Sequence, residues 1–145
     1  ARHAITVTMH LDKTLPRVMA DPILIEQVAA NLVRNACDAV ASNEGDRRID
    51  VYTALGAGGR FVKVSVTDNG TGLDGRTIET LCAPFYSTKS EGMGMGLAIC
   101  RSIIELHYGG LDAEDVPGGG ACLSFSVPCT SADDQPPPTG QENAP

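Results

Sequence analysis

The first part of the chain combines two periodicities of apolar residues. From Ile5 to Leu11 the apolar side chains occupy every second position, a spacing that predicts a half-buried strand. Asp21 and Pro22 are residue types that favour a helix start, an N-cap followed by proline at the first helical position. A turn cluster at 42–45 then predicts that this helix ends near Ala41.

The rest of the chain predicts two strand hairpins separated by a glycine-rich stretch and a helix. Each pair of strand-like segments is joined by a glycine-rich turn, which is typical of hairpins. Between the pairs, apolar residues recur at helical spacing, and two glycines follow them where a helix commonly ends. In chain order we predict strands at 48–55 and 60–67, a glycine-rich stretch at 68–96 with one short helix near 76–82, a helix at 97–107, and strands at 111–115 and 121–127.

This order of elements predicts an α+β fold. A mixed, mostly antiparallel sheet with helices covering one face makes a two-layer sandwich. We assign residues 1–128 to one domain and residues 129–145 to a polar, proline-rich tail that is predicted to be disordered. A domain of this size that opens directly into a strand pattern suggests a piece of a longer protein.

Composition restricts the partners of this domain. The net charge is −7 and the lysines and arginines form no cluster, so nucleic acid is not expected as a direct partner. No stretch approaches the roughly 20 apolar residues of a membrane span, and no secretion signal opens the chain. We therefore expect a cytoplasmic domain without membrane contact. Reduced thiols are favoured over the alternative of a structural zinc site, because no C-x-x-C pair occurs among Cys37, Cys82, Cys100, Cys122 and Cys129.

The long helix carries the first group of candidate site residues. Gln27, Asn31 and Asn35 are spaced four apart and therefore project from one helix face. Carboxamides on a half-buried helix are costly unless they are hydrogen-bonded, and a side-chain oxygen is a suitable ligand for magnesium. The alternative interpretation is the polar edge of an amphipathic helix.

A second group lies where the second hairpin strand ends. Asp68 is followed by Gly70 and Gly72, so an acid at a strand end precedes two glycines. The carboxylate can accept a hydrogen bond from an exocyclic amine, and the glycines let a planar base approach the backbone. The alternative is an Asp-Asn-Gly turn that closes a strand.

A third group precedes the second helix. Gly92, Gly94 and Gly96 alternate with other residues up to Leu97, which starts the apolar helical pattern. Such a turn leaves backbone N–H groups free for phosphates at a helix N-terminus. It has neither the Gly-Lys-Ser/Thr of a P-loop nor the G-x-G-x-x-G spacing of a dinucleotide site. The alternative is a flexible glycine linker.

The segment between the second and third groups, 83–89, has the composition of a lid. Phe85 can serve as an apolar anchor and Lys89 as a cation that faces phosphates. Considered separately, the segment could equally be an ordinary surface loop.

In this order, the four segments resemble the asparagine, first glycine, phenylalanine and second glycine boxes of histidine kinases. Those enzymes share a superfamily with gyrase B, the heat-shock ATPase chaperones and the mismatch-repair ATPases. The resemblance runs from about Asp21 to Pro128. The segments DPILIEQV and GMGMGLAICRSI are similar to those of PAS-linked kinases of the oxygen- and nitrogen-sensing kind. It implies a Bergerat-type ATP-binding fold, with ATP and Mg²⁺ bound under a flexible lid.

The resemblance also implies roles for single residues. Asn35 resembles the magnesium ligand that bridges the ATP phosphates, and Asn31 then lies one turn earlier, near the phosphates and the metal. Asp68 resembles the carboxylate that recognises the adenine amino group, and Gly70 and Gly72 shape the adenine wall.

Further roles fall on the lid and the second glycine box. Phe85 and Lys89 belong to the lid, and Lys89 is expected to contact a phosphate. Asn31 and Lys89 are the residues that we expect to take part in catalysis. The turn that cradles the phosphates corresponds to Gly92, Gly94, Gly96 and Leu97.

The sequence departs from the family pattern in several places. Some members have a basic or aromatic residue where Asp38 and Ala39 stand, so Asp38 is not expected to touch phosphate except through metal or water. The family often has Ser or Thr near the adenine acid, and we align Cys122 with that position, which puts one water-mediated contact in doubt. Met93 and Met95 are expected to anchor the lid by apolar contact.

Residue 31 bears on the reaction. The ATP-hydrolysing relatives generally place glutamate there, where it can activate water, whereas Asn31 is a poor base. The resemblance therefore implies transfer of the γ-phosphoryl group to a histidine on a separate phosphoacceptor domain, in cis or in trans within a homodimer. A response regulator is the expected partner of the full-length kinase. None of His3, His10 and His107 has the surroundings of a phosphoacceptor, so the chain alone is not expected to phosphorylate itself. The resemblance also implies dimerisation through the separate helical hairpin, so the chain alone is expected to be monomeric.

Two other functions fit the same superfamily. One is a serine protein kinase of the anti-sigma-factor type, against which the phenylalanine box and Asn31 argue. The other is a nucleotide-sensing module without phosphotransfer, against which the presence of all four boxes argues.

Overall fold

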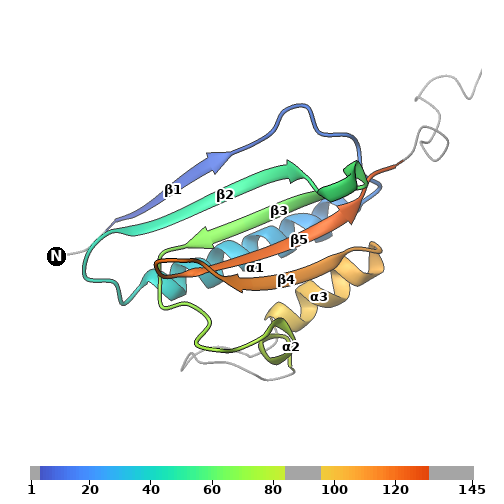
Figure 1. Cartoon of the computed structure of the whole chain (residues 1–145). Helices are drawn as coiled ribbons and strands as arrows, with labels where there is room; N and C mark the ends of the chain where they lie inside the picture. The colour runs from blue at the N-terminus through green and yellow to red at the C-terminus, as the bar shows by residue number, and fades with distance from the viewer. Residues whose placement is uncertain (1–3, 84–95, 131–145) are drawn as a thin grey trace, which may run out of the picture.

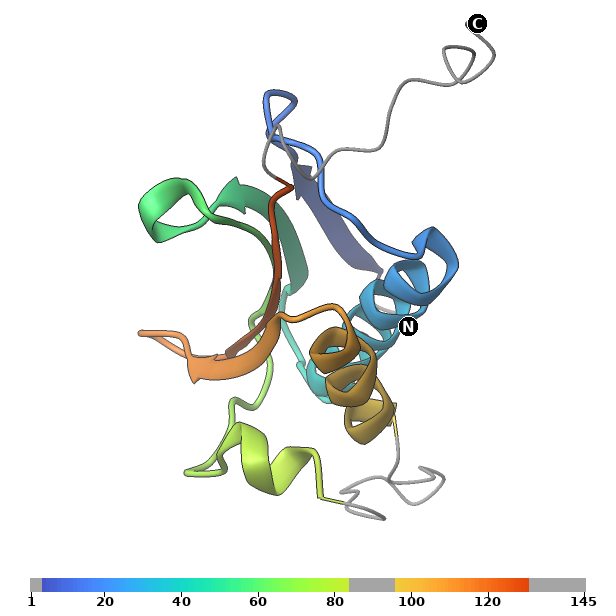
Figure 2. The same ribbon diagram turned by 90° about the vertical axis from the view of Figure 1, so that its right-hand side faces the viewer.

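The computed structural model describes residues 4–83 and 96–130. Within them, a five-stranded sheet forms one layer and helices on one side of it form the other (Figures 1 and 2). The strand order is β1-β2-β3-β5-β4; β1 and β2 are parallel and the other neighbours are antiparallel. This arrangement confirms the predicted two-layer α+β sandwich. The strands are β1 (Ile5–His10), β2 (Arg47–Leu55), β3 (Phe61–Asp68), β4 (Gly110–Asp115) and β5 (Ala121–Pro128), and the helices are α1 (Pro22–Val40), η1 (Ala57–Gly59), α2 (Ile78–Leu81) and α3 (Gly96–Leu106).

Helix α1 begins as its sequence predicts. Asp21 is the N-cap, and its Oδ1 accepts hydrogen bonds from the backbone N–H of Ile23 at 2.9 Å and of Leu24 at 3.3 Å. Pro22 takes the first helical position, where the missing N–H costs nothing. The cap satisfies two of the backbone donors that a helix start leaves open.

The core lies between the sheet and the helices. Helix α1 packs on β2 and β3, while α3 packs on β4 and β5. Side chains that alternate along the strands fill this layer, and each large apolar side chain that is fully buried contributes about 1.5–3 kcal/mol. The buried residues include Val28 and Leu32 of α1, Ile104 of α3, and Ile49, Val66 and Phe125 of the sheet.

Strand β1 is less buried than its alternating pattern predicts. Val7, Met9 and Leu11 are 47%, 56% and 51% exposed, and only Ile5 packs against the core. The strand itself is confirmed, but the prediction that it is half-buried is wrong along most of its length. The reason is its place at the edge of the sheet, since the two long helices cover the strands beside it.

The end of α3 is tied to the start of α1. Because the backbone N–H of Asp21 donates to Nε2 of His107 at 3.1 Å, the ring proton must be on Nδ1, which donates to the Ile103 carbonyl at 2.7 Å. Tyr108 then adopts a left-handed conformation with φ of 63°. Gly109 donates its N–H to the Ile104 carbonyl, and a Cβ there would overlap the Ser126 carbonyl, so glycine is required.

The first two residues of the predicted tail are ordered against the body of the domain. Cys129 forms a bridge with Val18, and Thr130 donates its N–H to the Arg17 carbonyl at 3.0 Å. The rest of the tail, 131–145, lies outside the described residues. In the part of the chain that is described, no helix is long and apolar enough to cross a membrane.

We expect that His107→Ala lowers the free energy of unfolding by about 1–2 kcal/mol, because the substitution leaves the backbone N–H of Asp21 without its acceptor and removes the bond to Ile103. Urea denaturation measures the change. His10→Ala is the matched control: the exposed His10 ring meets Asp50 and Tyr52 at the surface of the sheet and links no helices, so a change within about 0.5 kcal/mol is expected. Equal stability of the His107 variant and the wild type would contradict this role.

Candidate functional site

Three elements meet at the candidate site: the polar face of α1, the loop after β3, and the first turns of α3. Asn31 of α1 donates from Nδ2 to Sγ of Cys100 in α3 at 3.5 Å. The loop after β3 reaches the other end of the same helix, where Gly70 packs on Ala39. Ala39 lies one helical turn beyond Asn35, so the structure brings the predicted acid loop and the predicted asparagines together.

Asp68 is a buried carboxylate with one oxygen committed to the protein. It is 4% exposed, and its Oδ1 accepts hydrogen bonds from the backbone N–H of Gly70 at 2.8 Å and of Ala121 at 3.3 Å. No hydrogen bond within the described residues reaches Oδ2. Since no fully buried polar side-chain atom there lacks a partner, Oδ2 must be accessible to solvent or to a ligand. Burial raises the pKa of Asp68, and the bonds from Gly70 and Ala121 oppose that rise.

Two glycines hold this carboxylate in place by close backbone packing. A Cβ on Gly70 would overlap the Ala39 carbonyl of α1. A Cβ on Gly120 would overlap the Asp68 carbonyl, and Gly120 has a φ of +98°, which also favours glycine. Gly72 has a φ of +79° in the same loop. The loop can therefore approach α1 and β5 closely enough to fix the direction of the Asp68 side chain.

The two asparagines of α1 have different surroundings. Asn31 is partly buried and makes two side-chain hydrogen bonds: besides its bond to Cys100, its Oδ1 accepts a hydrogen bond from Nη1 of Arg34 at 3.0 Å. The Asn35 carboxamide is also partly buried, but no described residue hydrogen-bonds it. Gln27 is exposed at the start of the same face.

The residues present fit a magnesium ion that arrives with phosphates. The described residues hold no group of three His, Cys, Asp or Glu side chains that could bind a metal. The Asn35 oxygen is one hard, neutral ligand that no described residue hydrogen-bonds. Because magnesium usually keeps waters and takes few protein ligands together with substrate phosphates, a single carboxamide is a suitable anchor.

Two contacts of the site escaped the sequence analysis. Arg34 lies three residues after Asn31, and this helical spacing could have indicated that the two side chains meet. Cys100 was treated only as a free thiol, and its contact with Asn31 joins two helices that are far apart in the sequence. Burial raises the pKa of Cys100, so the thiol stays protonated.

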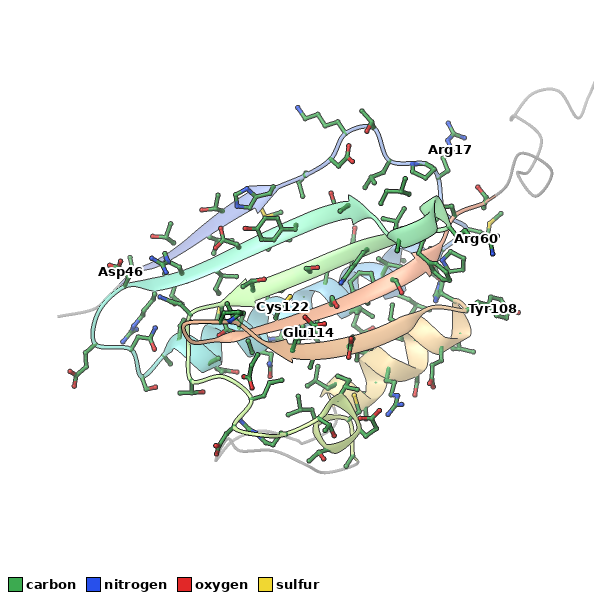
Figure 3. The ribbon with its side chains drawn as sticks, in the orientation of Figure 1. Arg17, Asp46, Arg60, Tyr108, Glu114 and Cys122 are labelled. Carbon is green, nitrogen blue, oxygen red and sulfur yellow. The ribbon has the colours of Figure 1, made fainter. Side chains whose placement is uncertain are left out.

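The alignment of Cys122 with the site is wrong. Ala121, not Cys122, is the residue of β5 whose backbone N–H reaches Asp68 and whose side chain is buried. Cys122 lies across from Glu114 on β4, and both side chains point to the open face of the sheet, away from the helices (Figure 3). Successive side chains of a strand point to opposite faces, so an error of one residue moves a side chain out of the site.

Several predicted site residues lie in the segment 84–95, outside the described residues: Phe85, Lys89, Gly92 and Gly94, together with Met93 and Met95. Both ends of this segment are placed. Gly96 begins α3, and the carbonyl of the partly buried Leu97 accepts a hydrogen bond from Sγ of Cys82, which follows α2, at 3.5 Å. Burial raises the pKa of Cys82 to about 11, so this thiol remains a donor at neutral pH.

The two described histidines both have structural partners. His10 is stacked on Tyr52, with ring centroids 4.4 Å apart, and lies 2.9 Å from the Asp50 carboxylate. Both ring nitrogens of His107 take part in the bonds that join α3 to α1. His3 lies outside the described residues.

Comparison with known sequences identifies the family. Residues 20–131 match the family described as histidine kinase-, DNA gyrase B-, and HSP90-like ATPase. The C4-dicarboxylate transport sensor protein DctS of Rhodobacter capsulatus is 44% identical over 127 residues, which cover 87% of this chain and 19% of that protein. The sensor protein FixL of Bradyrhizobium diazoefficiens is 42% identical over 118 residues, which cover 81% of this chain and 23% of that protein. The chain thus spans about a fifth of the length of these relatives.

Solved structures give the same result. The catalytic domain of the histidine kinase ThkA, in a nucleotide-free form, superposes with a TM-score of 0.73 at 32% identity and covers 88% of this chain and 82% of that one. ThkA in complex with the response regulator TrrA gives a TM-score of 0.66 at 33% identity, with 87% of this chain and 34% of that chain covered. The chain therefore belongs to the histidine kinase-, DNA gyrase B- and HSP90-like ATPase family, within the group of sensor histidine kinase catalytic domains.

Proposed function

We propose that this chain binds Mg-ATP and transfers the γ-phosphoryl group to a histidine on a separate phosphoacceptor domain. The observation that supports this most strongly is the Asp68 carboxylate. One of its oxygens is fixed by two backbone N–H groups and the other accepts no hydrogen bond from a described residue, while Gly70 of the same loop packs on Ala39, one helical turn beyond Asn35. That arrangement suits a nucleotide whose base lies at Asp68 and whose phosphates lie along α1.

Asp68 would select adenine. Its Oδ2 can accept a hydrogen bond from the exocyclic amine of adenine, whereas guanine presents a carbonyl oxygen there and would leave the carboxylate facing another acceptor. A buried acceptor that loses its donor costs a site about 1–3 kcal/mol, more when it is charged, so a polar group of this kind discriminates strongly between bases.

Asn35 would hold the magnesium ion through its side-chain oxygen, with the phosphates and water as the other ligands. When bound, the ion would neutralise charge on the phosphate oxygens and align the γ-phosphoryl group. Lys89, together with the glycines of the segment that is not described, is proposed to contact the phosphates from the lid.

The chemistry requires a nucleophile from outside this chain. An imidazole nitrogen of the acceptor attacks the γ-phosphorus, the bond from that phosphorus to the bridging oxygen breaks, and ADP leaves with the electron pair. The resulting phosphoimidazolium then loses its ring proton. Asn31 does not favour hydrolysis, because an amide is a poor base and its oxygen already accepts a bond from Arg34.

The acceptor and the response regulator would belong to the longer protein or to its partners. The chain spans 19% of DctS and 23% of FixL, which leaves room in those proteins for other domains. The complex of the relative ThkA with a response regulator supports such a partner for the full-length kinase.

Asp68→Asn tests the adenine contact. The amide can still accept the bonds from Gly70 and Ala121 through its oxygen, so the fold is kept, but its NH₂ group faces the adenine amine and repels it. We expect the affinity for ATP to fall about 10- to 100-fold in calorimetry. Asp50→Asn, on the open face of the sheet, is the matched control and should bind ATP as the wild type does. Unchanged ATP affinity in the Asp68 variant would remove the basis of the proposal.

Radioactive γ-labelled ATP tests the transfer. The chain alone should remain unlabelled, while a histidine-kinase phosphoacceptor domain added in trans should acquire label that is lost in acid. Acid-stable label would instead indicate a serine kinase, and rapid stable labelling of the chain itself would show that the acceptor has been assigned wrongly. Binding of ATP without any transfer would favour the nucleotide-sensing module.

A further inference from the structure

We propose that Arg34 is a positioning residue for phosphoryl transfer: it fixes the orientation of the Asn31 carboxamide so that Asn31 presents an N–H, rather than an oxygen, to the γ-phosphoryl group. The proposal rests on the function proposed above. It starts from two hydrogen bonds, Arg34 Nη1 to Asn31 Oδ1 at 3.0 Å and Asn31 Nδ2 to Cys100 Sγ at 3.5 Å.

The two partners of Asn31 differ in what they can specify. The Cys100 thiol is a weak partner: its Sγ donates to the Val28 carbonyl at 4.0 Å and accepts from Asn31 at 3.5 Å, so it favours the same orientation only slightly. A guanidinium has donors only, so the group that Arg34 meets must be the oxygen. Arg34, at 3.0 Å, is therefore the stronger of the two constraints on the orientation, and the weak contact to the buried Cys100 sulfur agrees with it.

The fixed orientation has a chemical consequence. With Oδ1 bonded to Arg34, the Nδ2 group of Asn31 is turned toward α3, where one of its hydrogens meets Cys100 and the second is bonded by no described residue. α3 is also the helix whose N-terminus follows the proposed phosphate-binding turn. An N–H on this side of α1 would attract phosphate oxygens bound near that turn, whereas a flipped amide would present an oxygen and repel them.

Position and exposure make Arg34 suitable for this role. Asn31 and Arg34 are three residues apart and therefore adjacent on one face of α1. The Arg34 side chain is exposed, so it can be replaced without disturbing the core. Phosphoryl transfer depends on positioned donors and on charge near the leaving and transferring oxygens. A wrongly oriented donor therefore lowers the rate of transfer by a larger factor than it lowers the affinity for ATP.

The test uses this chain with ATP, Mg²⁺ and a phosphoacceptor domain added in trans. We expect Arg34→Met to reduce kcat for transfer about tenfold while KM for ATP changes less than about twofold. Arg34→Lys also carries only donors and should recover most of the rate. Arg60→Met is the matched control, because Arg60 is exposed and precedes β3 at the end opposite Asp68 (Figure 3). It should behave as the wild type.

The double variant Asn31→Ala with Arg34→Met decides whether Arg34 acts through Asn31. If it does, the double variant is no slower than Asn31→Ala alone, because there is no carboxamide left to orient. If the two substitutions instead multiply their effects on kcat, the proposal is overturned. A higher KM with unchanged kcat in Arg34→Met would also overturn it, because that result indicates only electrostatic attraction of ATP. If the wild-type chain neither binds ATP nor transfers phosphate, the proposed function itself fails, which is a separate outcome.

Discussion

The close packing of the loop after β3 against helix α1 determines the geometry of the site. Gly70 lies against the Ala39 carbonyl with no room for a side chain, and its N–H binds the Asp68 carboxylate. The N–H of Ala121 holds the same oxygen from β5. The second oxygen of Asp68 accepts no hydrogen bond from a described residue. A strand end, a helix and a second strand thus fix one carboxylate in a loop that packs on the helix that carries Asn35.

Helix α1 serves the fold and the site with different faces. One face carries the buried side chains Val28 and Leu32, which pack against the sheet and α3. The face beside it carries the polar residues, with Asn31 held between Arg34 and Cys100. Because core packing fixes the rotation of the helix about its axis, it also fixes where the carboxamides project. His107 and the cap of Asp21 add a second constraint at the start of the helix.

Local signals were sufficient for the helices and strands. The Asp21 cap and the apolar periodicities predicted the helices and strands, and residues near Asn31 and Asp68 do converge. Tertiary features were not predictable in the same way. The exposure of Met9 depends on how far the helices extend over the sheet edge. Cys122 was assigned to the site in place of Ala121 because the alignment was off by one residue. A shift of one residue along a strand moves the side chain to the other face of the sheet.

The most direct test of the central claim is a crystal structure of the chain with a non-hydrolysable ATP analogue and Mg²⁺. The account predicts that the exocyclic amine of adenine lies within hydrogen-bond distance of Asp68 Oδ2, and that the metal between the phosphates is bound by Asn35 Oδ1. A nucleotide bound elsewhere, or one whose base does not contact Asp68 while its phosphates lie away from α1, would contradict it.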